Sequence, residues 1–265
     1  MTDNAQKLLN AITAYIRPTT FPVAVKLVFD GEEAQRPAKA KKPMETLRHP
    51  LALCQGVALA RRYGWNVVFD RQDHACPVSI VLMGYEPPEM LDSGKIACPG
   101  YAGSVEAGAV MEQANVKLPN GPKEMWFAPL DKAEFSPDVV LVYGNAAQIA
   151  RMVQGANYKT GKGVSSKSFG RLACSSYIAR TYLEGECSMI VPSGGERIFA
   201  ICQDDELIFS IPASQFEDVA YGIEAVHKQG LIRYPTPFFG LLAEPKFPDY
   251  YWSIIESENK AAPAK

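Results

Sequence analysis

The chain has 265 residues, of which 47% are hydrophobic and 21% charged, with a net charge of −2 at neutral pH. This composition is typical of a globular protein with a substantial core and excludes a disordered chain. The balanced charge argues against nucleic acid as a partner, because phosphate binding needs a concentrated basic surface. No segment approaches the roughly 20 apolar residues of a membrane-spanning helix.

The first 18 residues favour a cytoplasmic protein. They lack the basic start, apolar middle and small-residue cleavage site of a signal peptide. Leu8, Leu9, Ile12 and Ile16 instead recur at helical spacing, which predicts an amphipathic helix. In a chain without an export signal, six cysteines are expected to be reduced. Each is then either a small buried hydrophobe or a chemically active group.

The segment from Leu53 to Cys76 has the clearest pattern in the first half of the chain. A Val-rich strand is expected over residues 21–30, followed by a polar connector over 31–50. A helix is then predicted to open at Cys54 and to end at Gly64. A strand over 65–69 follows, and a polar loop closes on Cys76.

The middle of the chain predicts a series of alternating elements. Residues 77–88 form a buried apolar segment ending in a turn, and a Gly-rich stretch containing Cys98 leads into a helix over 104–113. Strands are predicted over 124–130 and 138–144. Asn145 and Gln148 then have the spacing of a capping box that opens another helix.

The second half repeats this order of elements. Cys174 opens a helix that ends at Gly185, and a strand over 189–191 follows. Strands are predicted over 196–202 (ERIFAIC) and 205–212 (DELIFSIP). Ser214 and Glu217 then have the spacing of a second capping box. Superposing 127–161 on 199–230 gives strand, turn, strand, capping box, helix and glycine in both, although α+β units also resemble one another by chance.

We therefore predict an α+β protein, one compact unit over 1–265, with duplicated halves at 20–165 and 166–240. An aromatic, proline-rich tail covers 241–265.

Four cysteines have the surroundings of metal ligands. Cys54 and Cys174 are predicted at helix starts, where unpaired amides and the helix dipole lower a thiol pKa. Cys76 and Cys98 each precede proline in a loop, as cluster-binding cysteines often do. Together they supply the four thiolates of a 4Fe–4S cluster. The chain has no C-x-x-C, which excludes a zinc ribbon or a ferredoxin run. Cys187 and Cys202 are expected to be buried hydrophobes.

Two other interpretations of the same residues stay open. A catalytic thiol at Cys54 or Cys174 needs a nearby histidine, and the sequence offers three: His49, His74 and His227. Alternatively, a Gly- and Ser-rich loop over 158–171 binds an anionic ligand through its basic residues, or is simply a solvated loop. Those residues are Lys159, Lys162, Lys167 and Arg171.

The ordered motifs resemble the uncharacterised ArCR family of bacterial and archaeal proteins. They are Pro22-Val-Ala-Val-Lys26, Cys54-Gln55 with Ala60-Arg61, Cys76 followed by Gly84, Cys174, and Gly194-Gly195-Glu196-Arg197. The resemblance implies a cytoplasmic protein of anaerobe-rich lineages, with cysteines recurring at these positions, and it implies no established activity. In the family a cysteine often precedes the Gly-x-Arg element. Here that neighbourhood reads Pro192-Ser193-Gly194-Gly195, so Cys98, or His74 in its place, becomes the fourth ligand.

The sequence therefore predicts an iron–sulfur protein with a redox, electron-transfer or accessory role in anaerobic metabolism. Cys54, Cys76, Cys98 and Cys174 would hold the cluster, and a redox protein or a larger anaerobic enzyme would be its partner. The first alternative is a metal-free protein that binds a small anionic or aromatic ligand, and the second is a cysteine-dependent enzyme. The duplicated core and aromatic tail are compatible with a homodimer.

Overall fold

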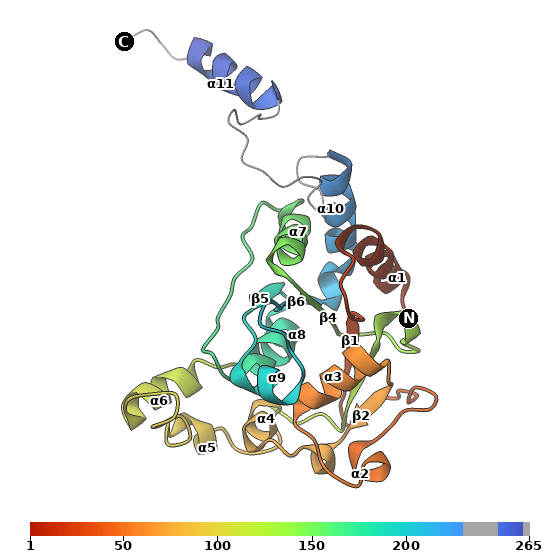
Figure 1. Ribbon diagram of the computed structural model, residues 1–265, viewed down its shortest axis with the longest axis vertical. Helices are drawn as coiled ribbons and strands as arrows, with labels where there is room; N and C mark the ends of the chain where they lie inside the picture. Colours follow the sequence, from red (N-terminus) through yellow and green to blue (C-terminus); the bar gives the residue numbers. More distant parts are fainter. Residues whose placement is uncertain (230–248, 262–265) are drawn as a thin grey trace.

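The computed structural model describes residues 1–229 and 249–261, with side chains described as far as residue 257. Its centre is one six-stranded antiparallel sheet with the strand order β2-β3-β1-β4-β6-β5 (Figure 1). The strands are β1 (Val23–Val28), β2 (Val67–Phe69), β3 (Glu124–Pro129), β4 (Val139–Gly144), β5 (Ser188–Ile190) and β6 (Leu207–Pro212). This arrangement confirms the predicted α+β class. Part of the predicted tail, residues 241–248 and 262–265, lies outside the described residues.

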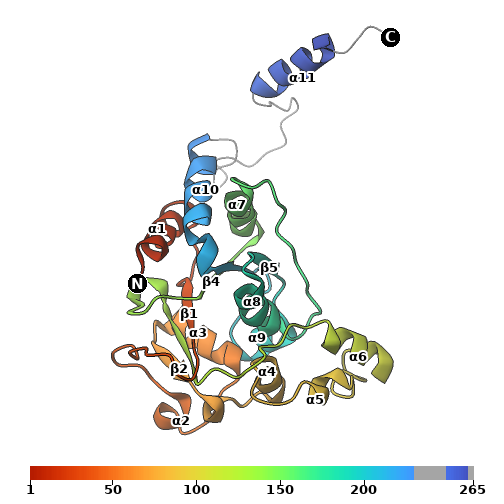
Figure 2. The ribbon, with the colours of Figure 1, turned by 180° about the vertical axis from the view of Figure 1, so that it is seen from behind.

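Helices from the first residues, the middle and the second half of the chain cover one face of the sheet (Figure 2). They are α1 (Asp3–Ala11), its π-helical continuation η1 (Ile12–Ile16), α7 (Ala146–Asn157) and α10 (Phe216–Gln229). Leu8, Ile12 and Ile16 are fully buried there, as the helical spacing predicts. α7 and α10 approach so closely that a methyl group on Gly222 would lie 2.0 Å from the carbonyl oxygen of Gly155.

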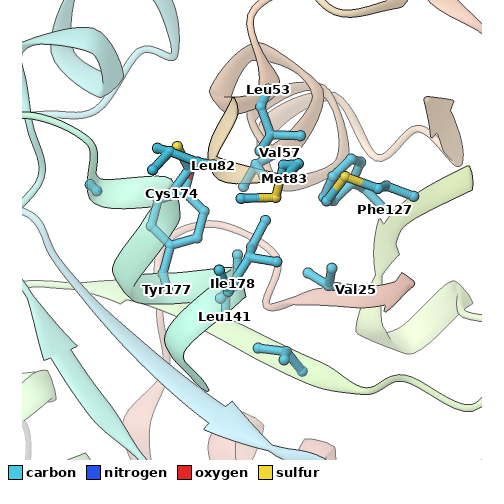
Figure 3. Close-up of a cluster of buried hydrophobic side chains, with 14 of the residues drawn as sticks. Val25, Leu53, Val57, Leu82, Met83, Phe127, Leu141, Cys174, Tyr177 and Ile178 are labelled. Atoms are coloured by element: carbon cyan, nitrogen blue, oxygen red, sulfur yellow. The ribbon is translucent and has the colours of Figure 1, made fainter. Parts of the chain in front are cut away.

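The opposite face is covered mainly by α3 (Leu53–Tyr63), α4 (Pro77–Leu82) and the consecutive helices η4 (Ser175–Arg180) and α8 (Thr181–Glu184). α3 ends at Gly64 (φ 69°) and α8 at Gly185 (φ 65°), in the left-handed conformation that glycine accepts without steric cost. Helix and strand side chains meet in one buried cluster (Figure 3), which includes Leu53, Val57, Tyr177, Ile178, Val25 and Leu141.

The remaining elements complete the described part of the chain. They are α2 (Pro43–Thr46), η2 (Arg71–Asp73), α5 (Glu89–Asp92), α6 (Val105–Gln113), η3 (Leu130–Lys132), α9 (Gly194–Phe199), η5 (Ala213–Gln215) and α11 (Asp249–Ala261). α5 and α6 project to one side of the sheet (Figure 1). None of the described helices combines the length and apolar character needed to cross a bilayer.

Most predicted elements are confirmed, and one strand is wrong. The Asn145–Gln148 capping box opens α7 as expected, and Ser104 caps α6. The predicted strand ERIFAIC is instead mostly the helix α9. The reason is local, because Ser193 and Glu196 form a capping box that starts a helix. The apolar segment after Cys76 is likewise helical, as α4.

The order of the strands is symmetric about the centre of the sheet. β1, β2 and β3 occupy the positions in one half that β4, β5 and β6 occupy in the other, and β1 pairs with β4 at the centre. The specific superposition of 127–161 on 199–230 fails, because residue 199 ends a helix where residue 127 lies in a strand. The predicted internal duplication is therefore not confirmed, and the halves 20–165 and 166–240 stay a prediction.

The buried guanidinium of Arg61 connects α3 with the segment between α9 and β6. Its Nη1 donates to Glu206 Oε1 at 2.7 Å, and its Nη2 donates to the carbonyl oxygen of Ile201 at 3.1 Å. The guanidinium carbon also lies 3.9 Å from the centre of the Tyr143 ring. Arg62 reaches the same carboxylate from a partly exposed position. Arg61 thus fixes α3 against the other half of the sheet.

We predict that Arg61→Met lowers the free energy of unfolding by about 3 kcal/mol, because it removes one partner of a buried ion pair. Arg62→Met is the matched control, since its half-solvated pair with the same carboxylate contributes about 1 kcal/mol or less. Urea denaturation followed by circular dichroism measures both. Equal losses in the two variants would contradict the assignment.

His74 is buried without a hydrogen-bond partner for either ring nitrogen. Its ring lies 5.2 Å from that of Phe69 and 5.2 Å from that of Tyr85, measured between centroids. Burial, with a smaller effect of the Arg71 charge opposed by Asp70, lowers the pKa of His74 to about 4. The folded protein therefore holds this imidazole neutral under conditions where an unfolded chain would protonate it.

This neutral histidine predicts a pH-dependent loss of stability. Below pH 6.5 the unfolded chain binds a proton that the folded chain rejects until about pH 4, so the free energy of unfolding falls across this window. The full effect of the lowered pKa is about 3 kcal/mol. His74→Phe should lack this component in urea titrations of metal-free protein, whereas the exposed His49→Gln should keep it. An unchanged pH slope in His74→Phe would refute the explanation.

Candidate functional site

A cavity of about 270 Å³ lies where the starts of four helical segments meet. The residues come from the beginnings of α3, α4 and the helix that contains η4, from both ends of α9, and from the loop before α6. Its lining includes Ala52, Leu53, Cys54, Cys76, Val78, Ser79, Ile96, Tyr101, Arg171, Leu172, Ala173, Cys174, Ser193, Gly195, Glu196 and Phe199. Segments separated by more than 100 residues thus form one site.

Three of the predicted ligand cysteines line this cavity. Cys54 is in the first turn of α3, Cys76 precedes α4 and Cys174 precedes η4. Cys54 and Cys174 are 8% and 9% exposed, and Cys76 is half-buried. The Cys54 thiol donates a weak hydrogen bond to the carbonyl oxygen of Gly195, at 3.8 Å. All three are free thiols, and each comes from the start of a different helix.

The thiols of Cys54 and Cys174 are held in their protonated form. Burial raises the pKa of both thiols well above the ordinary value, and the nearby Glu196 and Cys76 add to this effect. Amides at the start of α3 act in the opposite direction on Cys54 but are outweighed. The expectation that a helix start lowers these pKa values is therefore wrong, because desolvation is the larger effect.

Glu196 places a buried carboxyl group in the wall of the same cavity. It accepts hydrogen bonds from the Ser193 amide at 2.9 Å, from the Ser193 hydroxyl, and from Tyr177 Oη at 3.3 Å. Burial raises the pKa of Glu196, although these hydrogen bonds oppose the shift. The carboxyl is thus fully engaged in capping α9 and anchoring η4.

Cys98 does not line the cavity, but its loop does. Ile96 and Tyr101, on either side of it, are both lining residues, and Cys98 itself is half-buried. His74, the other candidate fourth ligand, packs between aromatic rings and is absent from the lining. Within residues 1–229 and 249–257, no group of three or more His, Cys, Asp or Glu side chains is arranged to hold a single metal ion.

The two remaining cysteines lie outside this cavity. Cys187 packs on the face of the sheet covered by α7 and α10, and its thiol donates to Gln215 Oε1 at 3.0 Å. Cys202 is buried beside Glu206 and Arg61, and burial raises its pKa to about 12. Both are buried in the structure, as predicted.

Of the four basic residues in the predicted anion-binding loop, Arg171 lines the cysteine cavity. Lys159 instead pairs with Asp218 on α10, at 2.6 Å. Lys162 lines a separate cavity near Cys187, and the Lys167 carbonyl oxygen accepts a hydrogen bond from Ser176. The four basic residues therefore do not converge on one ligand site, and of the four only Arg171 lines the cysteine cavity.

Arg171 has buried partners that the sequence pattern did not reveal. Its Nη2 lies 3.0 Å from the carboxylate of Glu112 on α6, and its guanidinium carbon lies 4.6 Å from the centre of the Tyr101 ring. Glu112 is on the predicted helix over 104–113, and no local signal marks it as buried. Ser193 and Glu196, by contrast, have the spacing of a capping box, which is a signal that the sequence alone contains.

A larger cavity, of about 560 Å³, lies on another part of the molecule, between the end of η1 and the end of α3. Arg17, Thr20 and Arg62 are among its lining residues. It contains no cysteine or histidine, so the concentration of chemically distinctive side chains favours the smaller cavity as the functional site.

Comparison with known proteins confirms the family resemblance. The model of the family described as uncharacterised ArCR matches residues 11–222, which include Cys54, Cys76, Cys98 and Cys174. An uncharacterised protein of Methanocaldococcus jannaschii is 25% identical over 228 residues, covering 84% of this chain and 93% of its own length. No solved structure matches the chain. Because the family model spans well over half of the sequence, the chain belongs to the uncharacterised ArCR family.

Proposed function

We propose that this protein binds an iron–sulfur cluster of the 4Fe–4S type in the cysteine cavity, with Cys54, Cys76 and Cys174 as ligands. The supporting observation is that three free cysteines, distant in sequence, line one cavity of about 270 Å³. A structural cysteine is buried singly in a core, as Cys187 is, whereas a cluster site needs several sulfurs around one space.

A cluster fits this spread of sulfurs better than a single ion does. Around one metal ion all ligands must converge on a single point, and the described residues contain no such group. In a 4Fe–4S cluster each thiolate meets a different iron, so the sulfurs stay apart. Cys98, whose loop forms part of the cavity wall, is the proposed fourth ligand.

The raised pKa values of the Cys54 and Cys174 thiols oppose cluster binding, because iron binds the deprotonated thiolate. Cys54 and Cys174 are protonated in the metal-free protein, so each of these two thiols must lose its proton as iron binds. Coordination to a cation supplies the compensating positive charge. The amides at the start of α3 then favour the negative sulfur of Cys54.

The proposed role is redox, electron transfer or service to a larger anaerobic enzyme in the cytoplasm. Burial of two ligands and the apolar walls would set the cluster potential. Ile96, Tyr101 and Phe199 are exposed apolar side chains at the cavity rim, and such a rim suits contact with a redox partner. A thiol enzyme receives less support, since no histidine of the described chain lines the cavity.

We predict that Cys54→Ser, Cys76→Ser and Cys174→Ser each remove most of the bound iron, because a serine hydroxyl is a poor substitute for a thiolate ligand. The measurement is iron and acid-labile sulfide content after anaerobic purification, together with absorbance near 400 nm. Wild-type protein that carries no iron, both after anaerobic purification and after anaerobic reconstitution with iron and sulfide, would refute the proposed function.

Two buried cysteines provide matched controls for this series. Cys187→Ser and Cys202→Ser change sulfur to oxygen outside the cavity, so both should retain wild-type iron content. Cys98→Ser tests the fourth ligand separately. Loss of iron in Cys187→Ser as well would show that the effect is misfolding, and circular dichroism of every variant identifies that outcome.

A further inference from the structure

The cavity of about 560 Å³ between the ends of η1 and α3 is rich in arginine and threonine. Arg17 and Arg62 line it, together with Thr13 and Thr19. Its volume lies within the roughly 300–1,000 Å³ that is typical of small-molecule sites. None of the described residues that line it is a cysteine, so a ligand of this cavity is independent of the proposed cluster.

Positive charge exceeds negative charge around this cavity. Three arginines line it, and two of them, Arg61 and Arg62, pair with the single carboxylate of Glu206. The third, Arg17, makes no ion pair with any described residue. Asp131 is the acidic residue among the described lining residues, so three guanidinium charges meet two carboxylates. The excess favours an anionic ligand.

Arg17 and Arg62 both keep side-chain nitrogens available to a ligand. Arg17 is exposed, and its Nε donates to the carbonyl oxygen of Ala14 at 3.1 Å. Its two terminal nitrogens have no hydrogen-bond partner in the described part of the chain. The side chain of Arg62 is 23% exposed, and of its terminal nitrogens Nη2 is the one that contacts Glu206. A ligand can therefore replace water on both guanidinium groups.

Hydrogen bonds hold the backbone around the cavity in place. The buried Gln148 donates from Nε2 to the carbonyl oxygens of Ile16, at 3.1 Å, and Arg17, at 2.7 Å. The Phe21 amide donates to the carbonyl oxygen of Arg61 at 3.1 Å. Carbonyl groups at helix ends carry partial negative charge, which opposes an anion. Because these carbonyls already accept hydrogen bonds, the full charges of the arginines dominate.

The remaining walls suit a ligand with an apolar body. Leu9, Pro18 and Phe21 contribute apolar surface, and the Phe21 ring is available for stacking because the residue is 38% exposed. Thr13 and Thr19 are exposed and add hydroxyl donors. The cavity thus combines charged donors, neutral donors and one accessible aromatic ring.

We infer that this cavity binds a phosphate monoester with an aromatic or apolar body. The phosphate group would lie between the guanidinium groups of Arg17 and Arg62, whose paired N–H donors match its oxygens. A phosphate offers three acceptor oxygens and close to two negative charges at neutral pH, which suits this number of donors better than a carboxylate does. The organic body would pack against Phe21.

Phenyl phosphate is the probe, and phenol and inorganic phosphate represent its two halves. Calorimetric titration of the full chain at low ionic strength, where charges are least screened, should show binding of phenyl phosphate. Phenol lacks the charge and inorganic phosphate lacks the ring, so each should bind roughly tenfold more weakly or worse.

Arg17→Gln and Arg62→Gln should each weaken the binding of phenyl phosphate roughly tenfold, because each removes a charged donor. Arg62→Gln leaves Glu206 paired with the buried Arg61, so the fold is retained. Arg48→Gln is the matched control for Arg17→Gln. Arg48 is also exposed and has the same left-handed backbone (φ 59° against 56°), but it lies outside the cavity, so this variant should keep wild-type affinity.

Three results would each overturn the inference. Phenol binding as tightly as phenyl phosphate would exclude recognition of the phosphate group. Inorganic phosphate binding as tightly would exclude a contribution of the organic body. A double variant, Arg17→Gln/Arg62→Gln, that stays folded by circular dichroism and keeps wild-type affinity would exclude this cavity as the binding site.

Discussion

The buried ion pair between Arg61 and Glu206 is the contact on which the geometry of the cavity depends. α3 carries Cys54 at its start and Arg61 in its last turn, so a contact at one end of the helix orients the other. Through Ile201 and Glu206 this contact ties α3 to the segment that directly follows α9. Gly195 and Glu196, which form the facing wall, belong to α9. A buried charge that must stay paired thereby keeps two walls of the cavity in register.

The cavity combines features that oppose one another in the metal-free protein. Burial raises the pKa of the two thiols and of Glu196, whereas the start of α3 favours negative charge. The proposed cluster would resolve part of this conflict, because its iron would bind the sulfurs as thiolates.

The symmetric strand order gives this site its position. α3 and the helix containing η4 occupy matching places on the same face, each preceding an outer strand, β2 or β5. Their starting cysteines, Cys54 and Cys174, consequently line the same cavity. Cys76 has no cysteine counterpart in the other half, where Ser193 and Glu196 contribute instead. The site is thus asymmetric in chemistry although the strands around it are symmetric in order.

The sequence alone determined the local elements and the identity of three cavity cysteines. Turn glycines at 64 and 185, the capping box at Asn145, and the apolar period of the first helix act over a few residues, so their patterns are readable without tertiary contacts. Only the tertiary structure decided that Arg171 lines the cysteine cavity while Lys159, Lys162 and Lys167 do not. It also decided that Glu112 is buried and that the thiols of Cys54 and Cys174 are protonated. Each of these depends on desolvation by segments distant in the chain, and local sequence does not encode burial of that kind.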